Sequence, residues 1–366
     1  MRPRSTAEPL KILLIRLRLI GDVVFTTPII RAVRQRYPQA RLSYLVEAAA
    51  APVLSANPHL SDVITTSHSR GWLRLRDDLR LGRQLRSEHF DLVIDLHGGP
   101  RSAWLTWASR APRRVGYDVP GRSWMYTQVV HRPRTYRARH AVENQWDLLR
   151  VTDAAFDRDP SPEFDRVEMP VDPRVASAMS HTLQELGLPT GARPVLLHVS
   201  AGNPFRRWPE ESFAALAADL VTASESRWVM VTAGPSDRQA AHRIIATAQA
   251  LAGSASGRIV DAESLSLAEL RAALEHASLF VGGDSGPMHI ASTSDVPIVT
   301  IYGPTLPERS APWRPARVAS AAAEPGPLPC RPCDQRVCVP GDFRCLADVS
   351  PEAVRDAATR LLETRP

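Results

Sequence analysis

Residues 282–289, with the sequence GGDSGPMH, form the densest group of side chains and glycines that could bind a ligand. They follow an apolar run at residues 279–281, which predicts a buried strand, and they open a predicted helix. Glycines, a serine and a helix start can hold a phosphate or a ribose. The spacing fits neither GxGxxG, nor the P-loop, nor the GxSxG nucleophile elbow. We expect a ligand site, although His289 alone would also suit a hydrogen-bonded position on a buried helix face.

A second polar group lies between a predicted strand at residues 195–199 and a predicted helix at residues 210–223. Such a junction presents unpaired N–H groups and the positive end of the helix dipole. An arginine there, Arg206, can bind a phosphate through two parallel hydrogen bonds. The alternative is a solvated arginine beside a packed Trp208. We expect phosphate binding because small polar residues precede the arginine; they are Ser200, Gly202 and Asn203.

Gly21 and Asp22 directly follow the first predicted strand, at residues 11–16. A glycine lets the backbone turn tightly and lets a ligand approach closely. The aspartate would then lie at the carboxyl edge of a sheet, where ligands bind. On position alone, the simpler interpretation is that Asp22 caps the helix that follows, because aspartate is a preferred N-cap residue.

The chain has four cysteines in all, in the compact pattern C-x2-C-x4-C-x6-C. In a reducing compartment, clustered cysteines favour a metal over disulfides. Four thiolates suit a structural, tetrahedral zinc, and an iron–sulfur cluster is a less favoured occupant. The alternatives are four reduced thiols, or two disulfides if the protein meets an oxidant. The four residues are Cys330, Cys333, Cys338 and Cys345.

Short apolar runs alternate with helical patterns along the whole chain, which predicts doubly wound parallel sheets. Prolines cluster at residues 160–173 and divide the chain into residues 1–172 and 173–349, followed by a helix at 350–366. Residues 321–329 are rich in alanine and proline and predict an irregular loop. Further strands are expected at residues 41–46, 62–65, 90–96, 115–117, 228–232, 258–260 and 298–302.

The composition is that of an ordinary globular protein, with 366 residues, 44% hydrophobic and 23% charged. The sequence contains no run of about 18 uncharged apolar residues, so it predicts no membrane span. Arg16, Arg18 and Asp22 interrupt the first apolar run too early for a signal peptide, so the cytoplasm is the expected compartment.

The formal net charge is +6, and Lys11 is the only lysine among 45 basic residues. A basic surface favours anionic partners such as phosphate-bearing substrates and lipid headgroups. Only the charge speaks for nucleic acid, because the chain has no Lys/Arg block, no zinc-finger pattern and no RNA-binding aromatic motif.

These motifs, in this order, resemble glycosyltransferase family 9, the ADP-heptose:lipopolysaccharide heptosyltransferases. The likeness covers most of the chain from about residue 10. The Gly-Asp-x5-Pro start and the Asp-Ser-Gly-Pro-Met-His-Ile-Ala block are specific in combination. The stretches that carry it are KILLIRLRLIGDVVFTTPIIRAVRQRYP, FDLVIDLHG, FRRWPEESFAALAADL, FVGGDSGPMHIA and IYGPT.

The resemblance implies a GT-B fold, in which two Rossmann-like doubly wound domains face an interdomain cleft, the first binding the acceptor and the second the nucleotide sugar. It implies an inverting, metal-independent transfer of a heptose or a related sugar from an ADP-sugar to the lipopolysaccharide inner core. It implies a lipid-linked saccharide as the acceptor. The basic surface would then help the chain to dock as a peripheral protein on the anionic inner face of the inner membrane.

The resemblance also assigns roles to single residues. Asp22 corresponds to the general base of the family, and Arg206 stands where the family has a phosphate-binding lysine. The donor is expected to contact the residues that match the family's second-half motifs, namely Ser200, Gly202, Ser236, Asp284, Ser285, Gly286 and His289. Anionic groups of the acceptor are expected at basic residues of the first half, namely Arg101, Arg113, Arg114 and His140.

Two alternatives to a transferase stay open from the sequence. A nucleotide-sugar epimerase of the same fold would turn over its substrate without an acceptor. A non-catalytic relative would bind the nucleotide sugar without transferring it. The presence of Arg206 in place of the family's lysine favours this alternative. The intact Asp22 and His289 argue against it.

Overall fold

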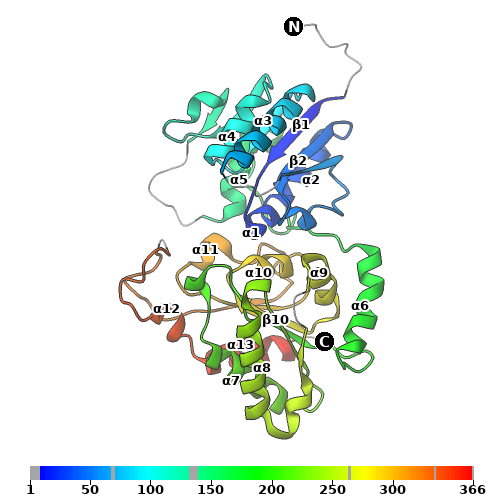
Figure 1. Cartoon of the computed structure of the whole chain (residues 1–366), viewed down its shortest axis with the longest axis vertical. Helices are drawn as coiled ribbons and strands as arrows, with labels where there is room; N and C mark the ends of the chain where they lie inside the picture. Colours follow the sequence, from blue (N-terminus) through cyan, green and yellow to red (C-terminus); the bar gives the residue numbers. More distant parts are fainter. Residues whose placement is uncertain (1–8, 67–70, 132–138, 263–264, 334, 365–366) are drawn as a thin grey trace. The chain divides into compact units, whose positions relative to one another are not determined.

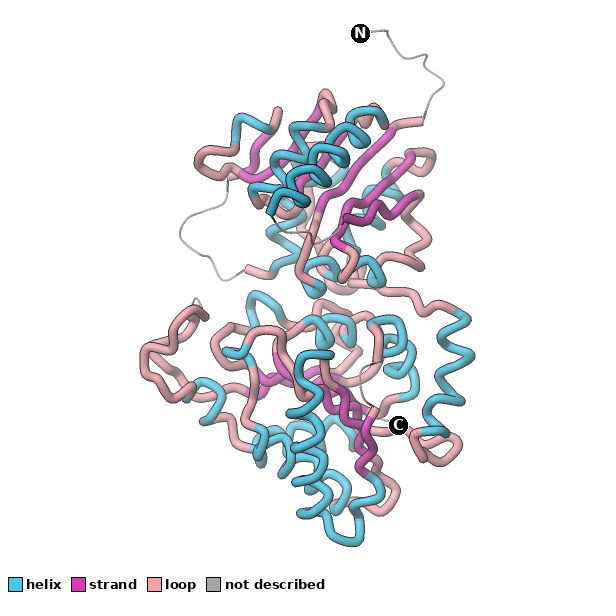
Figure 2. Tube along the Cα trace, in the orientation of Figure 1, coloured by secondary structure: helices cyan, strands magenta, loops and turns pink. Residues whose placement is uncertain are grey.

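The computed structural model of the chain describes residues 9–66, 71–131, 139–262, 265–333 and 335–364. The chain divides into two compact units, Met1–Met169 and Pro170–Pro366. Each unit contains a six-stranded sheet with helices packed against it (Figures 1 and 2). Every strand pair in both sheets is parallel, which confirms the predicted α/β class with two Rossmann-like sheets.

The sheet of the first unit has the order β3-β2-β1-β4-β5-β6. Its central strand, β1, is an apolar run because neighbouring strands and packed side chains cover it, and Ile12 to Ile15 are fully buried. The last strand, β6, was not predicted, because its three residues are only partly buried and form no apolar run. The strands are β1 (Lys11–Ile15), β2 (Arg41–Glu47), β3 (Asp62–Thr66), β4 (Leu92–Asp95), β5 (Arg113–Tyr117) and β6 (Gln128–Val130).

The helix expected after Gly21 and Asp22 is two helices, α1 and α2. Pro28 is the second residue of α2, where its missing N–H costs no helical hydrogen bond. The chain therefore interrupts the helix before the proline. The helices of this unit are α1 (Ile20–Val24), α2 (Thr27–Arg36), α3 (Gly71–Ser87), α4 (Pro100–Ala108) and α5 (Ala141–Arg150).

The second unit repeats this topology, with the order β12-β11-β10-β7-β8-β9. The prediction of an irregular loop at residues 321–329 is wrong at its start, because strand β12 occupies Ser320–Ala323 and pairs with β11. Its alanines give no strand pattern, and the pairing with a buried neighbour decides the conformation. The other strands are β7 (Val195–His198), β8 (Val229–Thr232), β9 (Ile259–Asp261), β10 (Leu279–Gly283) and β11 (Ile298–Ile301).

The C-terminal helix α13 belongs to the core of the second unit. Ser350 is its N-cap, with its hydroxyl oxygen accepting the Ala353 N–H at 3.2 Å. Val354, Ala357 and Ala358 pack into the core cluster around β7, β8 and β10. The helices of this unit are α6 (Pro173–Glu185), α7 (Glu210–Thr222), α8 (Arg238–Ala252), α9 (Leu267–His276), α10 (Gly286–Ala291), α11 (Pro307–Ser310), α12 (Arg344–Ala347) and α13 (Pro351–Glu363).

Both sheets have the first strand of their unit near the middle, so the strand order reverses between β1 and β4 and again between β7 and β10. In open parallel sheets, ligands bind beyond the carboxyl ends of the strands at this reversal. The topology therefore directs attention to the loops that follow these four strands. Among the described residues, no helix combines the length and the apolar character needed to cross a bilayer.

Candidate functional site

In the first unit, Asp22 lies beyond the carboxyl end of β1, on the short helix α1. Its carboxylate is 2.5 Å from Nη2 of Arg16, and the side chain is 31% exposed. Nη1 of the same arginine donates to the Leu96 carbonyl at 2.7 Å, so Arg16 joins the loops after β1 and β4. A partly exposed carboxylate with one fixed cationic partner can still accept a proton from a substrate.

The interpretation of Asp22 as an N-cap is wrong. The N-cap residue of α1 is Leu19, and Asp22 is the third residue of the helix. Its carboxylate accepts the Leu19 N–H at 3.3 Å, which is the backbone half of a capping box. The aspartate therefore stabilises the helix start from inside, while one side of it stays exposed.

The loop after β4 is held by Asp95, which is fully buried. One carboxylate oxygen accepts the N–H groups of His97 and Gly98, each at 2.9 Å, and the other accepts the hydroxyls of Ser102 and Tyr126 at 2.9 and 2.7 Å. Burial lowers the pKa of His97, and the nearby Arg16 lowers it further. The FDLVIDLHG motif contains both residues, but its pattern indicates a role for neither.

The basic residues predicted for the acceptor have contacts inside the first unit. Arg101 is 9% exposed and pairs with Glu47 and Asp78 at 3.2 and 2.7 Å. Arg113 donates to the Thr152 carbonyl at 2.7 Å, and Arg114 donates to Met125 and Ala111 carbonyls. An acceptor role for these arginines stays a prediction.

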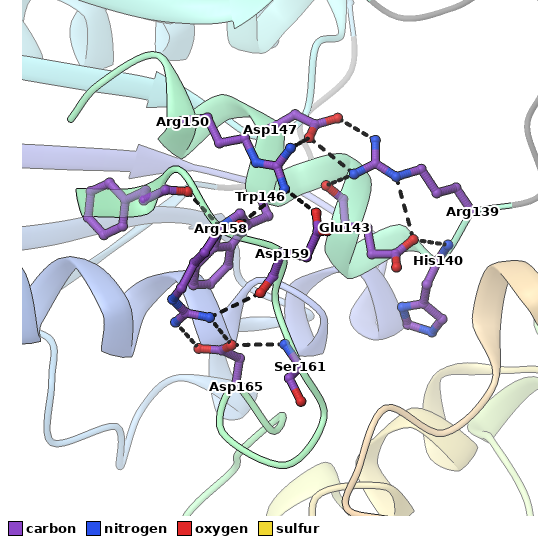
Figure 3. A network of polar contacts seen from close by, with 11 residues as sticks. Arg139, His140, Glu143, Trp146, Asp147, Arg150, Arg158, Asp159, Ser161 and Asp165 are labelled. Atoms are coloured by element: carbon purple, nitrogen blue, oxygen red, sulfur yellow. Dashed lines mark hydrogen bonds and ion pairs between the residues drawn. The ribbon is translucent and has the colours of Figure 1, made fainter. Parts of the chain in front are cut away.

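His140, the fourth residue predicted for the acceptor, is the N-cap of α5. Its Nδ1 accepts the Val142 N–H at 3.2 Å, and its own N–H donates to Glu143 at 3.1 Å. Figure 3 shows this histidine at the edge of an ion-pair network that runs through Arg139 and Asp147. Its imidazole is 8% exposed and packs edge-on against Phe25. The contacts account for a structural role, and acceptor binding stays a prediction.

In the second unit, Asp284 contacts residues of two loops and of helix α10. It follows β10, is 2% exposed, and accepts the Thr305 hydroxyl at 2.7 Å. Nη1 of Arg206 lies 3.2 Å away and Nε2 of His289 3.4 Å away. Burial opposes ionisation, but the hydrogen bond and charge of His289, the charge of Arg206 and the Thr305 hydroxyl outweigh it and lower the pKa of Asp284 to about 2.

Arg206 lies in the loop after β7 and uses two of its three nitrogens inside the protein. Nε donates to Gln335 Oε1 at 2.7 Å, and Nη1 donates to the Asp284 carbonyl at 2.9 Å. Within the described parts of the chain, Nη2 has no hydrogen-bond partner, and the side chain is 29% exposed. One face of the guanidinium fork is thus available to an anion. Sequence patterns gave no indication of Gln335.

The remaining residues predicted for the donor are divided between buried and exposed positions. Ser200 is buried, and its hydroxyl oxygen accepts the Gly234 N–H at 2.9 Å. Gly202 is exposed, with open space around its Cα. Ser236 is exposed and donates to Asp237 at 3.3 Å. The structure therefore gathers Ser200 and Arg206 on the loop after β7, and it places Ser236 on the loop after β8.

The glycine pair Gly282 and Gly283 belongs to β10 and not to a loop after it, which corrects the sequence prediction. A Cβ on Gly283 would come within 3.1 Å of the Arg206 carbonyl, so the glycine lets the loop after β7 cross the end of β10. Ser285 and Gly286 follow at the start of α10, which has only six residues. In the region that the structure describes, the buried Ser285 hydroxyl has no partner, so a ligand could use it.

The four cysteines are free thiols, each partly buried. Burial raises the pKa of Cys345, and the neighbouring Cys333, Cys330 and Cys338 raise it further. The fold therefore brings the four thiols near one another. No set of three His, Cys, Asp or Glu side chains in the described ranges is arranged as a metal site.

The sequence model of glycosyltransferase family 9 (heptosyltransferase) matches residues 78–340. Lipopolysaccharide heptosyltransferase 2 of Salmonella typhimurium is 25% identical over 310 residues, which are 83% of this chain and 85% of that protein.

Solved structures show the same fold. A family 9 glycosyltransferase from Veillonella parvula superposes with a TM-score of 0.82 at 21% identity, covering 99% of this chain and all of the other. The E. coli heptosyltransferase WaaC with ADP superposes with a TM-score of 0.68 at 21% identity, covering 96% of this chain and all of the other. The two Rossmann-like sheets are thus those of the GT-B heptosyltransferases.

The buried His198 makes the second unit sensitive to acid. It ends β7, contacts Thr232 and Ser200 at 3.0 and 3.3 Å, and burial lowers its pKa to about 4. The unfolded chain therefore binds a proton between pH 6.5 and 4 that the folded chain does not, and stability falls as the pH falls through this window.

We expect His198→Gln to remove part of this pH dependence. Urea unfolding at pH 7 and pH 5 should show that the wild-type chain loses about 2 kcal/mol more than the variant between the two values. Equal losses in the two proteins would contradict a buried neutral histidine.

Proposed function

Because this chain belongs to glycosyltransferase family 9, the heptosyltransferases, we propose that it transfers a heptose or a related sugar from an ADP-sugar to the lipopolysaccharide inner core. We propose ADP as the nucleotide because a solved structure of the same fold, that of E. coli heptosyltransferase WaaC, contains ADP. It names lipopolysaccharide because the curated relative is a lipopolysaccharide heptosyltransferase. The observation that carries the chemistry is the partly exposed Asp22 carboxylate at the strand-order reversal of the first sheet.

We propose that Asp22 is the general base. It would take the proton of an acceptor hydroxyl while that oxygen attacks the anomeric carbon of the donor. The new C–O bond would form as the bond from the anomeric carbon to the diphosphate breaks, so ADP leaves with the electron pair. A single displacement of this kind inverts the anomeric centre.

A retaining double displacement would need a second carboxylate as nucleophile. The acidic residue among the expected donor contacts is Asp284. It is 2% exposed, and its oxygens already meet Arg206, Thr305 and His289. Because these contacts occupy the Asp284 carboxylate, we propose a single displacement with inversion of the anomeric centre.

The leaving diphosphate needs positive charge and hydrogen-bond donors. In our proposal Arg206 supplies both through Nη2, and the unpartnered Ser285 hydroxyl adds a donor. The remaining predicted donor contacts are Ser200, Gly202, Ser236, Gly286 and His289. Since the guanidinium provides the charge, the proposal requires no metal ion for catalysis.

The test is ADP release with ADP-heptose as donor and Kdo-lipid A as acceptor. We expect release that depends on the acceptor and yields a glycosylated product. Asp22→Asn should lower turnover by about 10²- to 10⁴-fold, the range for a lost general base, and leave ADP affinity unchanged.

Other outcomes of that assay would overturn parts of the proposal. Full turnover by Asp22→Asn would remove the base assignment. Release without acceptor would indicate an epimerase or a hydrolase, and donor binding without any release would indicate a non-catalytic member of the family.

We further propose that the four cysteines hold a structural zinc. Four soft thiols that the fold brings close together are a suitable donor set. Elemental analysis of the purified chain should give about one zinc per molecule. Cys333→Ser should lower both the metal content and the melting temperature. Metal-free protein with four reactive thiols would contradict this.

We also propose that the chain docks on an anionic membrane surface through α3. Trp72, Leu75 and Leu79 follow one another at helical spacing and are 79%, 50% and 42% exposed. Arginines at the same spacing lie beside them, namely Arg76, Arg80 and Arg83. The opposite face packs into the unit through Leu81 and Leu85. A basic helix with an exposed apolar face suits the lipid interface.

Sedimentation with phosphatidylglycerol vesicles tests the docking surface. Trp72→Ser should weaken binding by about tenfold, since a tryptophan buries a large apolar area. Trp124→Ser is the matched control, because that tryptophan is 62% exposed in the same unit. Equal binding by both variants, or binding that ignores lipid charge, would exclude α3 as the contact.

A further inference from the structure

The segment that carries the cysteines also contacts two loops of the candidate donor site, those after β7 and β11. The Cys333 N–H donates to the Pro304 carbonyl at 3.2 Å, and Arg331 donates to the Thr305 carbonyl at 2.9 Å. The Phe343 ring packs on the Phe205 ring, with centroids 5.3 Å apart. This segment, residues 330–333 and 335–345, therefore borders the loops after β7 and β11.

Gln335 provides the closest link between this segment and the donor site. Its Oε1 accepts from Asn203 Nδ2 at 2.9 Å and from Arg206 Nε at 2.7 Å. Both partners can only donate at these atoms, so the amide must present its oxygen to them. The two lone pairs of one carbonyl oxygen are thus shared between two residues of the loop after β7.

The guanidinium of Arg206 is fixed at two points. Gln335 holds Nε, and Asp284 holds Nη1 through its carbonyl and its carboxylate at 2.9 and 3.2 Å. A planar group held at two nitrogens has a defined plane, which leaves Nη2 in a constant orientation. Arginine side chains lose considerable rotamer entropy when they bind, so an arginine ordered in advance binds an anion with less loss.

We propose that Gln335 is a positioning residue, which orders Arg206 for the diphosphate of the nucleotide sugar. The inference rests on the proposed function of Arg206. It also explains how this chain tolerates an arginine where its family has a lysine. A lysine carries no N–H at the position of Nε and could not make the bond to Gln335. Arg206 and Gln335 therefore act as a pair, and restoring the lysine alone should weaken donor binding.

A double-mutant cycle with ADP as the probe tests the pair. Calorimetry on the full chain should show that Gln335→Ala weakens ADP binding about ten- to a hundredfold, the effect of losing one hydrogen bond to a charged group. Gln335→Glu keeps an acceptor oxygen and should restore most of the affinity. In an Arg206→Lys background, Gln335→Ala should have no further effect. In turnover, the donor KM should rise while the acceptor KM stays constant.

Val339→Ala is the control for general damage to the segment, because this side chain is 89% exposed; it should bind ADP as the wild type does. Wild-type affinity in Gln335→Ala, with affinity lost in Arg206→Ala, would overturn the positioning role and leave the donor site standing. An equal effect of Gln335→Ala with arginine or lysine at 206 would also overturn it. Unchanged ADP binding by Arg206→Ala would overturn the donor-site assignment, and the positioning role with it.

Discussion

A carboxylate removed from water must be neutralised and hydrogen-bonded, and the second unit is organised around one such group. Asp284 is almost fully buried after β10, and it draws Arg206 from the loop after β7 and Thr305 from the loop after β11. Because its pKa lies near 2, it is ionised at neutral pH. That constant charge orients Arg206 and gives three separate loops a common centre.

The first unit has a related arrangement, in which the buried group is a cation and the accessible group is a carboxylate. Arg16 is the largely buried group, at 12% exposure; it pairs with the Asp22 carboxylate and donates to the Leu96 carbonyl. In both units a guanidinium bridges the loops that follow the two strands at the reversal of strand order. The same topology thus sets a carboxylate beside a cation twice, with the carboxylate accessible in one unit and the cation accessible in the other.

The sequence predicts the parts of this structure that depend on local pattern. Buried strands such as β1 and β7 are continuous apolar runs, and Ser350 marks a helix start. The sequence does not predict features that depend on contacts with residues far away in the chain or on the exact start of a helix. The short edge strand β12 has no pattern of its own, and Asp22 caps α1 from its third position. Gln335 meets Arg206 across 129 residues of chain, and no spacing rule could have indicated that contact.

The basic edge of α3 consists of arginines, in a chain whose only lysine, Lys11, donates to the Glu88 carbonyl at 3.0 Å. A guanidinium cannot be acetylated as a lysine amine is, and it keeps its proton far into the alkaline range. The charge of this edge is therefore constant over the physiological pH range and is not removed by lysine-modifying enzymes. Ionic strength and the lipid composition opposite it are the variables that could tune its attraction to a surface.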